Sequence, residues 1–92
     1  MRTIKPVRSY KRDYKRERSG RFGPKLEDML RPVIEMLATD ETLPQRFCDH
    51  SLEGNWKGHR ECHVRPDLLL IYRKPDADSL ELVRLGSHSE LY

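Results

Sequence analysis

The 92-residue sequence predicts an α+β fold in which two N-terminal helices pack on a small antiparallel sheet, in the order β-α-α-β-β-β. Three observations predict it. Apolar residues recur at helical spacing in the first half of the chain, three runs typical of strands follow in the second half, and turn-forming residues separate those runs. The length favours a single domain over residues 1–92.

A strand and a short basic helix are expected at the N-terminus. Residues 3–8 alternate loosely between apolar and polar side chains, and Pro6 confines such a strand to a sheet edge or a bulge. Ser9 is expected to cap a helix that runs to about Arg18, because its side-chain oxygen can accept a free backbone N–H of the first turn.

The second helix is the clearest prediction, because one apolar stripe along it indicates a face turned toward the core. The stripe consists of Leu26, Met29, Leu30, Val33, Ile34 and Leu37. Pro24 suits the first turn of this helix, where the N–H that proline lacks has no partner in any case. Pro32 lies further in and is expected to kink the helix.

A loop over residues 39–58 is expected next, followed by three strands that form an antiparallel meander. Residues 58–64 and 80–85 alternate between apolar and polar side chains, whereas residues 68–73 form a nearly continuous apolar run. Turns that contain proline and aspartate separate the three strands.

The composition excludes two classes of protein. No apolar stretch approaches the roughly 20 residues needed to cross a bilayer, and the N-terminus lacks the apolar segment of a secretion signal. The expected location is therefore the cytoplasm, without membrane contact. In that compartment Cys48 and Cys62 are expected to stay reduced.

Basic residues concentrate at the N-terminus. Residues 1–25 hold ten Lys or Arg and two acidic residues, a net charge of +8, whereas the other 67 residues carry a net charge of −5. This asymmetry indicates that the N-terminal segment faces a polyanion, although a solvated helix face would produce the same pattern. The candidate contacts to nucleic acid are Lys11, Arg12, Lys15, Arg16, Arg18 and Arg21.

Three of the four histidines lie where a core would not place them. His50 lies in the loop, His63 near the end of a strand, and His88 just after the last strand. Folding of the meander is expected to bring them together with Asp67 at the hairpin turn, without a metal ion. The alternative is that they are isolated surface histidines. Zinc is disfavoured, because His59 and His63 would lie about 13 Å apart along a strand.

The second half of the chain resembles a known family. Residues 49–67 follow the pattern D-H-x-L-x-G-x-W-x-G-x-R-x-x-H-V-x-P-D, and residues 68–72 form an apolar run that ends in Ile-Tyr. Residues 84–88 read R-x-G-S-H, with Tyr92 four residues later. The combination resembles YafQ-type toxins of the RelE/ParE superfamily, closely over residues 49–92 and in element order over the whole chain.

The resemblance implies a RelE-like fold and the toxin of a type II toxin–antitoxin system. It further implies a ribosome-dependent endoribonuclease that cleaves mRNA in the ribosomal A site and so inhibits translation. The implied partners are a cognate antitoxin protein, the ribosome with its rRNA, and mRNA; no cofactor is implied, and the free toxin is expected to be a monomer. The implied catalytic residues are His50, His63, Asp67, His88 and Tyr92.

This chain departs from the family pattern at three positions, of which Ser51, where proline is usual, matters least. Leu68 stands where close members have a tryptophan that is counted among the active-site residues. The departure puts base stacking or the orientation of Asp67 in question. Tyr92 stands where the closest members have a phenylalanine.

The histidines suit a metal-free cleavage in which the ribose 2′-OH attacks the adjacent phosphorus. That reaction needs a base for the 2′-OH and an acid for the leaving 5′-oxygen, and imidazole serves in both roles near neutral pH. The expected acid–base pair is His88 with either His50 or His63, and the sequence does not assign which is which. Asp67 either acts as a base or orients an imidazole.

Arginine and tyrosine side chains are the candidates for contacts to the phosphate and the base. Arg84 and Arg60 are expected to stabilise the charge of the phosphorane, since a guanidinium forks onto phosphate oxygens. An interstrand structural role is the alternative for Arg60. Tyr92 is expected either to stack on a base or to close the end of the core.

Three other functions fit parts of the pattern. ParE-like relatives of the same fold act on DNA gyrase, but they lack the histidine cluster that this chain carries. A degenerate toxin, weakened at Leu68, would bind its antitoxin without cutting efficiently. A plain nucleic-acid-binding module would explain the basic N-terminal segment and nothing more.

Overall fold

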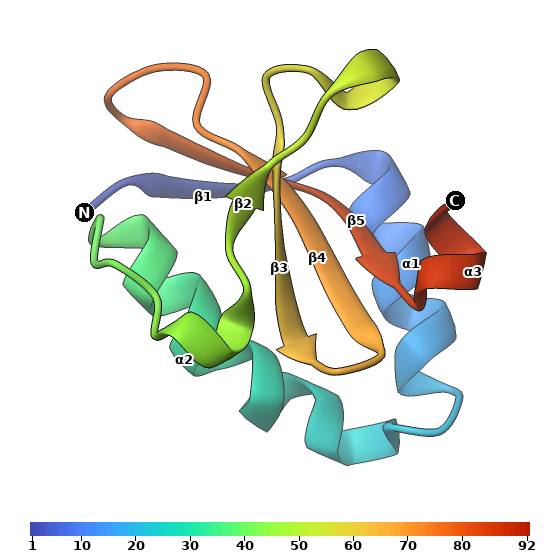
Figure 1. Cartoon of the computed structure of the whole chain (residues 1–92). Helices are drawn as coiled ribbons and strands as arrows, with labels where there is room; N and C mark the ends of the chain where they lie inside the picture. The colour runs from blue at the N-terminus through green and yellow to red at the C-terminus, as the bar shows by residue number, and fades with distance from the viewer.

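The computed structural model describes all 92 residues and contains one five-stranded sheet, with strand order β1-β5-β4-β3-β2 (Figure 1). The elements in chain order are β1 (Thr3–Pro6), α1 (Arg8–Arg18), η1 (Gly23–Lys25), α2 (Leu26–Ala38), η2 (Gln45–Phe47), β2 (His50–Ser51), η3 (Gly54–Trp56), β3 (Arg60–Arg65), β4 (Leu68–Arg73), β5 (Ser79–Gly86) and α3 (His88–Leu91), where η marks a 3-10 turn. The α+β class and the predicted order of the main elements are confirmed.

The sheet is mixed: the predicted antiparallel pairing holds for four of its strands, and the parallel pairing of the fifth was not predicted. β2, β3, β4 and β5 pair antiparallel, but β1 runs parallel to β5, with Thr3 opposite Ser79. The two parallel strands come from opposite ends of the chain, and no local pattern reports their direction. β1 is an edge strand, as Pro6 predicted, because proline has no N–H to donate to a second neighbour.

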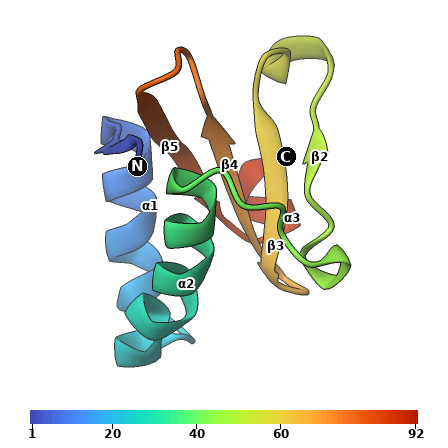
Figure 2. The same cartoon turned by 90° about the vertical axis from the view of Figure 1, so that its left-hand side faces the viewer.

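α1 and α2 lie side by side over one face of the sheet (Figure 2). The predicted stripe on α2 faces the core: Leu26, Leu30, Val33 and Leu37 are buried, and its other two residues are half-buried. α2 continues through Pro32, and Pro24 lies just before it in η1. No helix of the structure has the length and apolar character that a bilayer crossing needs.

The predicted cap of the first helix was wrong. α1 begins at Arg8, and its N-cap residue is Val7, which has no side chain able to accept a hydrogen bond. Ser9 lies inside the first turn, where its hydroxyl donates a 2.7 Å hydrogen bond to the carbonyl of Val83 on β5. The serine therefore fastens α1 to the sheet instead of capping the helix.

β4 is buried on both faces, which explains its continuous apolar run. Alternate side chains of a strand point to opposite faces of a sheet. Leu68, Leu70 and Tyr72 belong to the core under α1 and α2, whereas Leu69 and Ile71 face the other side. There they pack with Leu91 of α3 and with the half-buried Leu52, Trp56 and Val83.

Two short elements were missed. β2 lies within the predicted loop of residues 39–58 and has only two residues, too few for a periodic pattern. α3 has four residues, and its start is a capping box: the Ser87 side chain accepts the N–H of Glu90, and the Glu90 carboxylate accepts the N–H of Ser87. These two elements carry His50 and His88.

Candidate active site

A buried carboxylate, that of Glu61, lies between two of the predicted histidines. β2 pairs with β3 so that His50 stands opposite Glu61, and His63 lies two residues further along β3 on the same face. The Nε2 atoms of His50 and His63 lie 3.5 Å and 3.6 Å from the same oxygen, Oε1 of Glu61. The Glu61 side chain is only 7% exposed, and the two imidazole rings are 6.5 Å apart.

The C-terminus reaches the same carboxylate from the other side. The Tyr92 hydroxyl donates a 2.5 Å hydrogen bond to Oε2 of Glu61, and the His88 ring lies 5.0 Å from the Tyr92 ring. Burial of the phenol, together with the charge of Glu61 and the hydrogen bond to it, raises the pKa of Tyr92. Strands β2 and β3 and the end of the chain thus meet at Glu61.

We call five residues the histidine cluster: His50, Glu61, His63, His88 and Tyr92. Two of its imidazoles, those of His50 and His63, contact Glu61, which the sequence analysis missed, whereas His88 is linked to Glu61 only through the ring of Tyr92. The signal was present, because strand alternation places position 61 on the face of His63. Cys62 points the opposite way into the core, where burial raises the pKa of its thiol.

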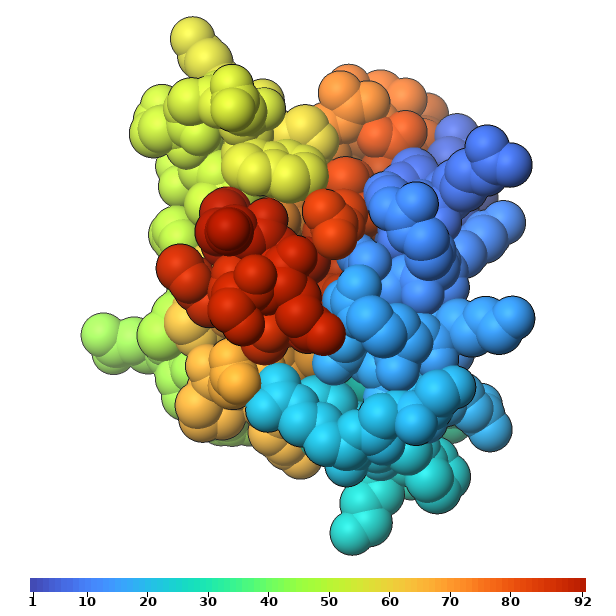
Figure 3. All heavy atoms as spheres, turned by 90° about the vertical axis from the view of Figure 1, so that its right-hand side faces the viewer, coloured from blue at the N-terminus to red at the C-terminus, as the bar shows by residue number.

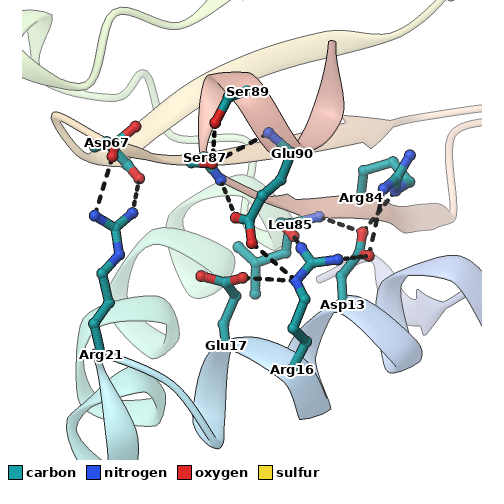
Figure 4. A network of polar contacts seen from close by, with 10 residues as sticks. All are labelled: Asp13, Arg16, Glu17, Arg21, Asp67, Arg84, Leu85, Ser87, Ser89 and Glu90. Carbon is teal, nitrogen blue, oxygen red and sulfur yellow. Dashed lines mark hydrogen bonds and ion pairs between the residues drawn. The ribbon is translucent and has the colours of Figure 1, made fainter.

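Asp67 does not join the histidine cluster. It lies in the β3–β4 turn, where its carboxylate accepts a 3.0 Å hydrogen bond from Arg21 and its backbone carbonyl accepts a second one of 2.5 Å (Figure 4). Both side chains are about half exposed or more. Asp67 also borders a polar pocket of about 430 Å³ that is lined by Arg16, Glu17, Gly20, Arg21, Asp67, Ser87, Ser89 and Glu90.

Arg84 is held by a fully buried carboxylate. Its Nε donates a 2.6 Å hydrogen bond to Asp13 on α1, and Asp13 also accepts the backbone N–H of Leu85 and a hydrogen bond from Arg16 (Figure 4). Burial alone would raise the pKa of Asp13. The hydrogen bonds from Arg84 and Leu85 and the charges of both arginines outweigh it and lower that pKa below its ordinary value.

Arg60 contacts a carboxylate of its own chain in the structure. Its Nε lies 3.3 Å from Oδ1 of Asp49, and the Tyr72 hydroxyl donates a 2.6 Å hydrogen bond to the same oxygen. Burial raises the pKa of Tyr72, and the contact with Asp49 raises it further. Asp49 therefore ties the segment before His50 to β3 and β4, and the sequence analysis missed this function.

Residues next to the histidine cluster hold the loop between β2 and β3 in place. Trp56 packs edge-on against the ring of His59, with 5.3 Å between ring centres, and both Trp56 and Leu52 pack on the apolar cluster beneath α3. The ring of His59 packs on Trp56 and on none of the other histidine rings. No group of three or more His, Cys, Asp or Glu side chains has a geometry that could hold a metal ion.

The predicted RNA contacts divide into two groups. Lys11, Arg12, Lys15 and Arg18 are exposed on one side of α1, and none of them forms an ion pair within the chain. We call these four residues the basic face. Arg16 and Arg21 are instead engaged within the chain, with acidic side chains and backbone carbonyls.

α1 and the C-terminal residues lie next to each other on one side of the molecule (Figure 3). Arg16 joins them, because it contacts Glu90 at 3.2 Å and donates to the carbonyl of Leu85. Gly86 makes this approach possible, since a Cβ there would lie 2.7 Å from Nη2 of Arg16. The basic helix and the element that carries His88 are therefore fastened together.

Comparison with known protein families identifies the family to which the chain belongs. A sequence model of the family described as the bacterial toxin YafQ of type II toxin–antitoxin systems matches residues 2–92. The chain belongs to the YafQ toxin family. The matched region contains every residue of the histidine cluster.

Individual YafQ relatives agree with this assignment. The mRNA interferase toxin YafQ of Escherichia coli K12 is 46% identical over 50 residues, which make up 54% of this chain and 53% of that protein. The chain spans 53% to 60% of the length of the curated relatives that it matches.

Two solved structures confirm the RelE/YafQ-like fold. A copper-bound mutant toxin from Helicobacter pylori has a TM-score of 0.91 and 40% identity, with 100% of both chains covered. The crystal structure of the Escherichia coli DinJ–YafQ complex gives a TM-score of 0.80 and 29% identity, with 100% of this chain and 99% of that chain covered.

Leu68 departs from the YafQ pattern in a defined structural setting. Its side chain is fully buried in the core beneath α1 and α2. In that position it does not reach solvent and has no surface on which a base could stack. Any stacking on RNA has to come from another side chain.

Proposed function

We propose that this protein is the toxin of a type II toxin–antitoxin pair and a ribosome-dependent endoribonuclease that cleaves mRNA in the ribosomal A site. One observation carries the proposal: the imidazoles of His50 and His63 share one buried carboxylate, Tyr92 links that carboxylate to His88, and α1 carries an unpaired basic face. Such a cluster can transfer two protons in one reaction. Family membership and the named activity of the Escherichia coli relative support the same function.

The reaction proceeds by attack of the ribose 2′-OH on the adjacent phosphorus. The new P–O2′ bond closes a 2′,3′-cyclic phosphate, and the P–O5′ bond breaks to leave a 5′-OH. One imidazole takes the proton from the 2′-OH, and a second gives a proton to the departing 5′-oxygen. His88 forms one half of this pair, and His50 or His63 forms the other.

Glu61 positions the pair. Its carboxylate holds the rings of His50 and His63 in place and stabilises the positive charge of whichever imidazole has taken up a proton. Through Tyr92 it also fixes the end of the chain that carries His88. The ring of Tyr92, which is half exposed, remains available to stack on a base.

Arg84 is the better of the two arginine candidates for the phosphate. Asp13 engages its Nε and Nη2 and leaves Nη1 free, and the side chain is 21% exposed. A guanidinium held rigidly by a carboxylate is preorganised to stabilise a phosphorane. Arg60 is assigned to the scaffold, because Asp49 and Tyr72 surround it.

Asp67 is assigned a supporting part in the reaction. Its carboxylate binds Arg21 and no imidazole, so it orients none of the histidines in this structure. It reaches a 2′-OH as a base only after Arg21 has moved to another anion, such as an rRNA phosphate. The pair is well exposed, so its exchange costs about 1 kcal/mol or less.

The partners follow from charge. The basic face suits the phosphates of rRNA, which position a protein without reading sequence. A cognate antitoxin with an acidic segment would cover the same region, and a solved relative is described as a complex of YafQ with DinJ. A toxin that acts on ribosomes acts in the cytoplasm, and the free protein is proposed to be a monomer.

The proposal is tested by cleavage in a purified translation system, mapped by primer extension. Wild type is expected to cut within translated codons and to leave the same RNA intact when ribosomes are omitted. His88→Ala is expected to abolish the cuts, whereas His59→Ala, the matched control outside the cluster, keeps them. Equal cutting of naked and translated RNA would overturn the ribosome dependence.

A degenerate, binding-only toxin is the second candidate, and the buried Leu68 is the observation that favours it. This candidate predicts that wild type and His88→Ala block translation equally and that neither yields cut RNA. Binding of an antitoxin would then be the remaining activity of the fold.

A further inference from the structure

A pocket of about 370 Å³ opens beside His63 and belongs to none of the contacts described so far. It lies between residues 46–48, at the end of η2, and residues 63–66, at the end of β3. Its volume is within the range of sites that hold small organic ligands. Because His63 lines it, any occupant lies directly beside the histidine cluster.

The walls of this pocket are apolar and aromatic. Phe47 is half-buried and packs against the main core, which fixes the plane of its ring. Val64 and Pro66 form the opposite side. The guanidinium of Arg46 lies over the Phe47 ring, 4.7 Å from its centre. Flat aromatic and guanidinium surfaces of this kind stack on nucleobases.

The rim of the pocket is positively charged. Arg46 and Arg65 are exposed, neither forms an ion pair with a carboxylate of the chain, and no acidic residue lines the pocket. The polar pocket next to Asp67 differs, because three acidic residues line it and engage its two arginines. The two guanidinium groups beside His63, which no carboxylate neutralises, therefore match a ligand with a flat ring and flanking phosphates.

The same segment positions both the pocket and a catalytic histidine. Phe47 and His50 lie on either side of Asp49, which Tyr72 and Arg60 hold against the sheet. A base stacked on Phe47 would therefore lie at a fixed separation from the imidazole of His50. That arrangement is what a substrate subsite next to a scissile bond requires.

We propose that this pocket binds one nucleotide of single-stranded RNA, next to the phosphodiester that is cut, as an extension of the function proposed above. The base stacks on Phe47 against Pro66, and Arg46 and Arg65 contact the phosphates on its two sides. Stacking accepts any base, so this subsite contributes affinity and alignment.

The test is a nuclear magnetic resonance titration of the 15N-labelled protein with a trinucleotide RNA whose riboses are 2′-O-methylated, so that it binds without being cut. The amides of residues 46–48 and 63–66 are expected to shift together. Phe47→Leu keeps the apolar packing but loses the aromatic ring, and it is expected to raise the Kd on the order of tenfold. Phe47→Tyr is expected to restore binding.

Charge is tested separately. Arg46→Gln and Arg65→Gln are each expected to weaken binding several-fold and to reduce the slope of log Kd against log salt by about 0.7. Arg31→Gln on α2 removes an equal charge far from the pocket, where Arg31 pairs with Glu27, and is expected to leave the Kd unchanged. Shifts confined to other residues, or an unchanged Kd in folded Phe47→Leu, would overturn the proposal.

The titration measures binding without cleavage, so it tests the proposed subsite independently of the proposed nuclease activity. A wild-type protein that binds the trinucleotide here but cuts no mRNA supports the subsite and contradicts the proposed function. If the wild type cuts mRNA, its cleavage kinetics provide a second test. Phe47→Leu is then expected to raise KM and to change kcat by no more than about twofold, and an unchanged KM would count against the subsite.

Discussion

At the scale of single residues, Glu61 is the group on which the three parts of the site converge. Its oxygens contact His50, His63 and Tyr92, and it is almost completely buried. A carboxylate buried beside imidazoles is stable only while its partners satisfy it. Its carboxylate therefore fixes the positions of the side chains that contact it.

Replacement of Glu61 by glutamine tests this role, because it keeps the shape and removes the charge. Glu61→Gln is expected to lower kcat by roughly 10²-fold with little change in KM, since an imidazolium formed in the reaction loses its counter-charge. Single-turnover cleavage of ribosome-bound mRNA measures this effect.

The control for that experiment is Tyr92→Phe, which removes only the hydroxyl on Glu61. It is expected to lower kcat by less than Glu61→Gln does, because the charge of Glu61 and the aromatic ring at position 92 both stay. A Glu61→Gln variant with wild-type kcat would show that the carboxylate is structural.

Several site residues could be predicted from the sequence, and others could not. Motif spacing indicated the histidines, and strand alternation could have revealed Glu61. The Arg21–Asp67 and Asp13–Arg84 pairs join residues 46 and 71 positions apart, and no local pattern reports such contacts. Arg84 is an example: nothing in the sequence indicated that Asp13 binds its guanidinium.

At the scale of secondary structure, α3 is the element on which the site depends most. Four residues form a helix here only because the capping box, the buried Leu91 and the contact from Arg16 all support it. Arg16 was predicted to bind RNA, but its guanidinium is already engaged by Asp13, Glu17 and Glu90. Its contacts with Glu90 and with the carbonyl of Leu85 link α1 to the C-terminal segment.

Arg16→Gln is therefore expected to loosen α3 and to lower kcat several-fold with KM unchanged. The amides of Leu91 and Tyr92, which donate to Ser87 and His88, are expected to exchange hydrogen faster. Arg12→Gln on the basic face provides the contrast and is expected to raise KM only. An Arg16→Gln variant that behaves like Arg12→Gln would return Arg16 to the RNA contacts.

The joint between α1 and β5 rests on Asp13. Asp13→Asn is expected to reduce the free energy of unfolding at pH 7 by about 2 kcal/mol. That is less than a fully buried pair would give, because Arg16 and Arg84 are partly exposed. Chemical denaturation measures the difference.

The same pair makes stability depend on pH. Because the pKa of Asp13 is lowered in the folded state, its contribution is present above the unfolded value of about 3.9 and is lost as the pH falls toward the folded value. The wild type and Asp13→Asn are expected to converge in stability below about pH 4. A difference that persists in acid would contradict this assignment.

The major elements could be predicted and the minor ones could not, for physical reasons. α2 and β4 each bury a long apolar pattern, so their sequence reports their environment directly. β2 and the parallel pairing of β1 are set by strands distant in the chain. α3 was readable from Ser87 and Glu90 but is shorter than a helical period pattern requires.

At the scale of the whole molecule, the uneven charge separates binding from chemistry. The basic face lies on α1, and the histidine cluster lies where β2, β3 and α3 meet. α1 and the C-terminal segment share one side of the molecule (Figure 3). Docking of α1 on rRNA would therefore present the cluster to mRNA that the ribosome already holds extended.

Salt dependence of ribosome binding tests the basic face. In a His88→Ala background, which cannot cut, the double variant Lys11→Gln, Lys15→Gln is expected to reduce the slope of log K against log salt by roughly 1.5. Sedimentation with ribosomes over a range of salt concentrations measures it. An unchanged slope would show that these lysines face solvent and contact no phosphate.

The chemistry at the histidine cluster is tested most directly by removing one oxygen from the substrate. Ribosomes are programmed with an mRNA that has a single 2′-deoxyribose immediately 5′ of the mapped cut, beside an all-ribose control. Loss of cleavage at that site alone, with a 2′,3′-cyclic phosphate and a 5′-OH at the control cut, is the predicted result. Cleavage that persists next to the deoxyribose would contradict attack by the 2′-OH and the acid–base roles of the histidines.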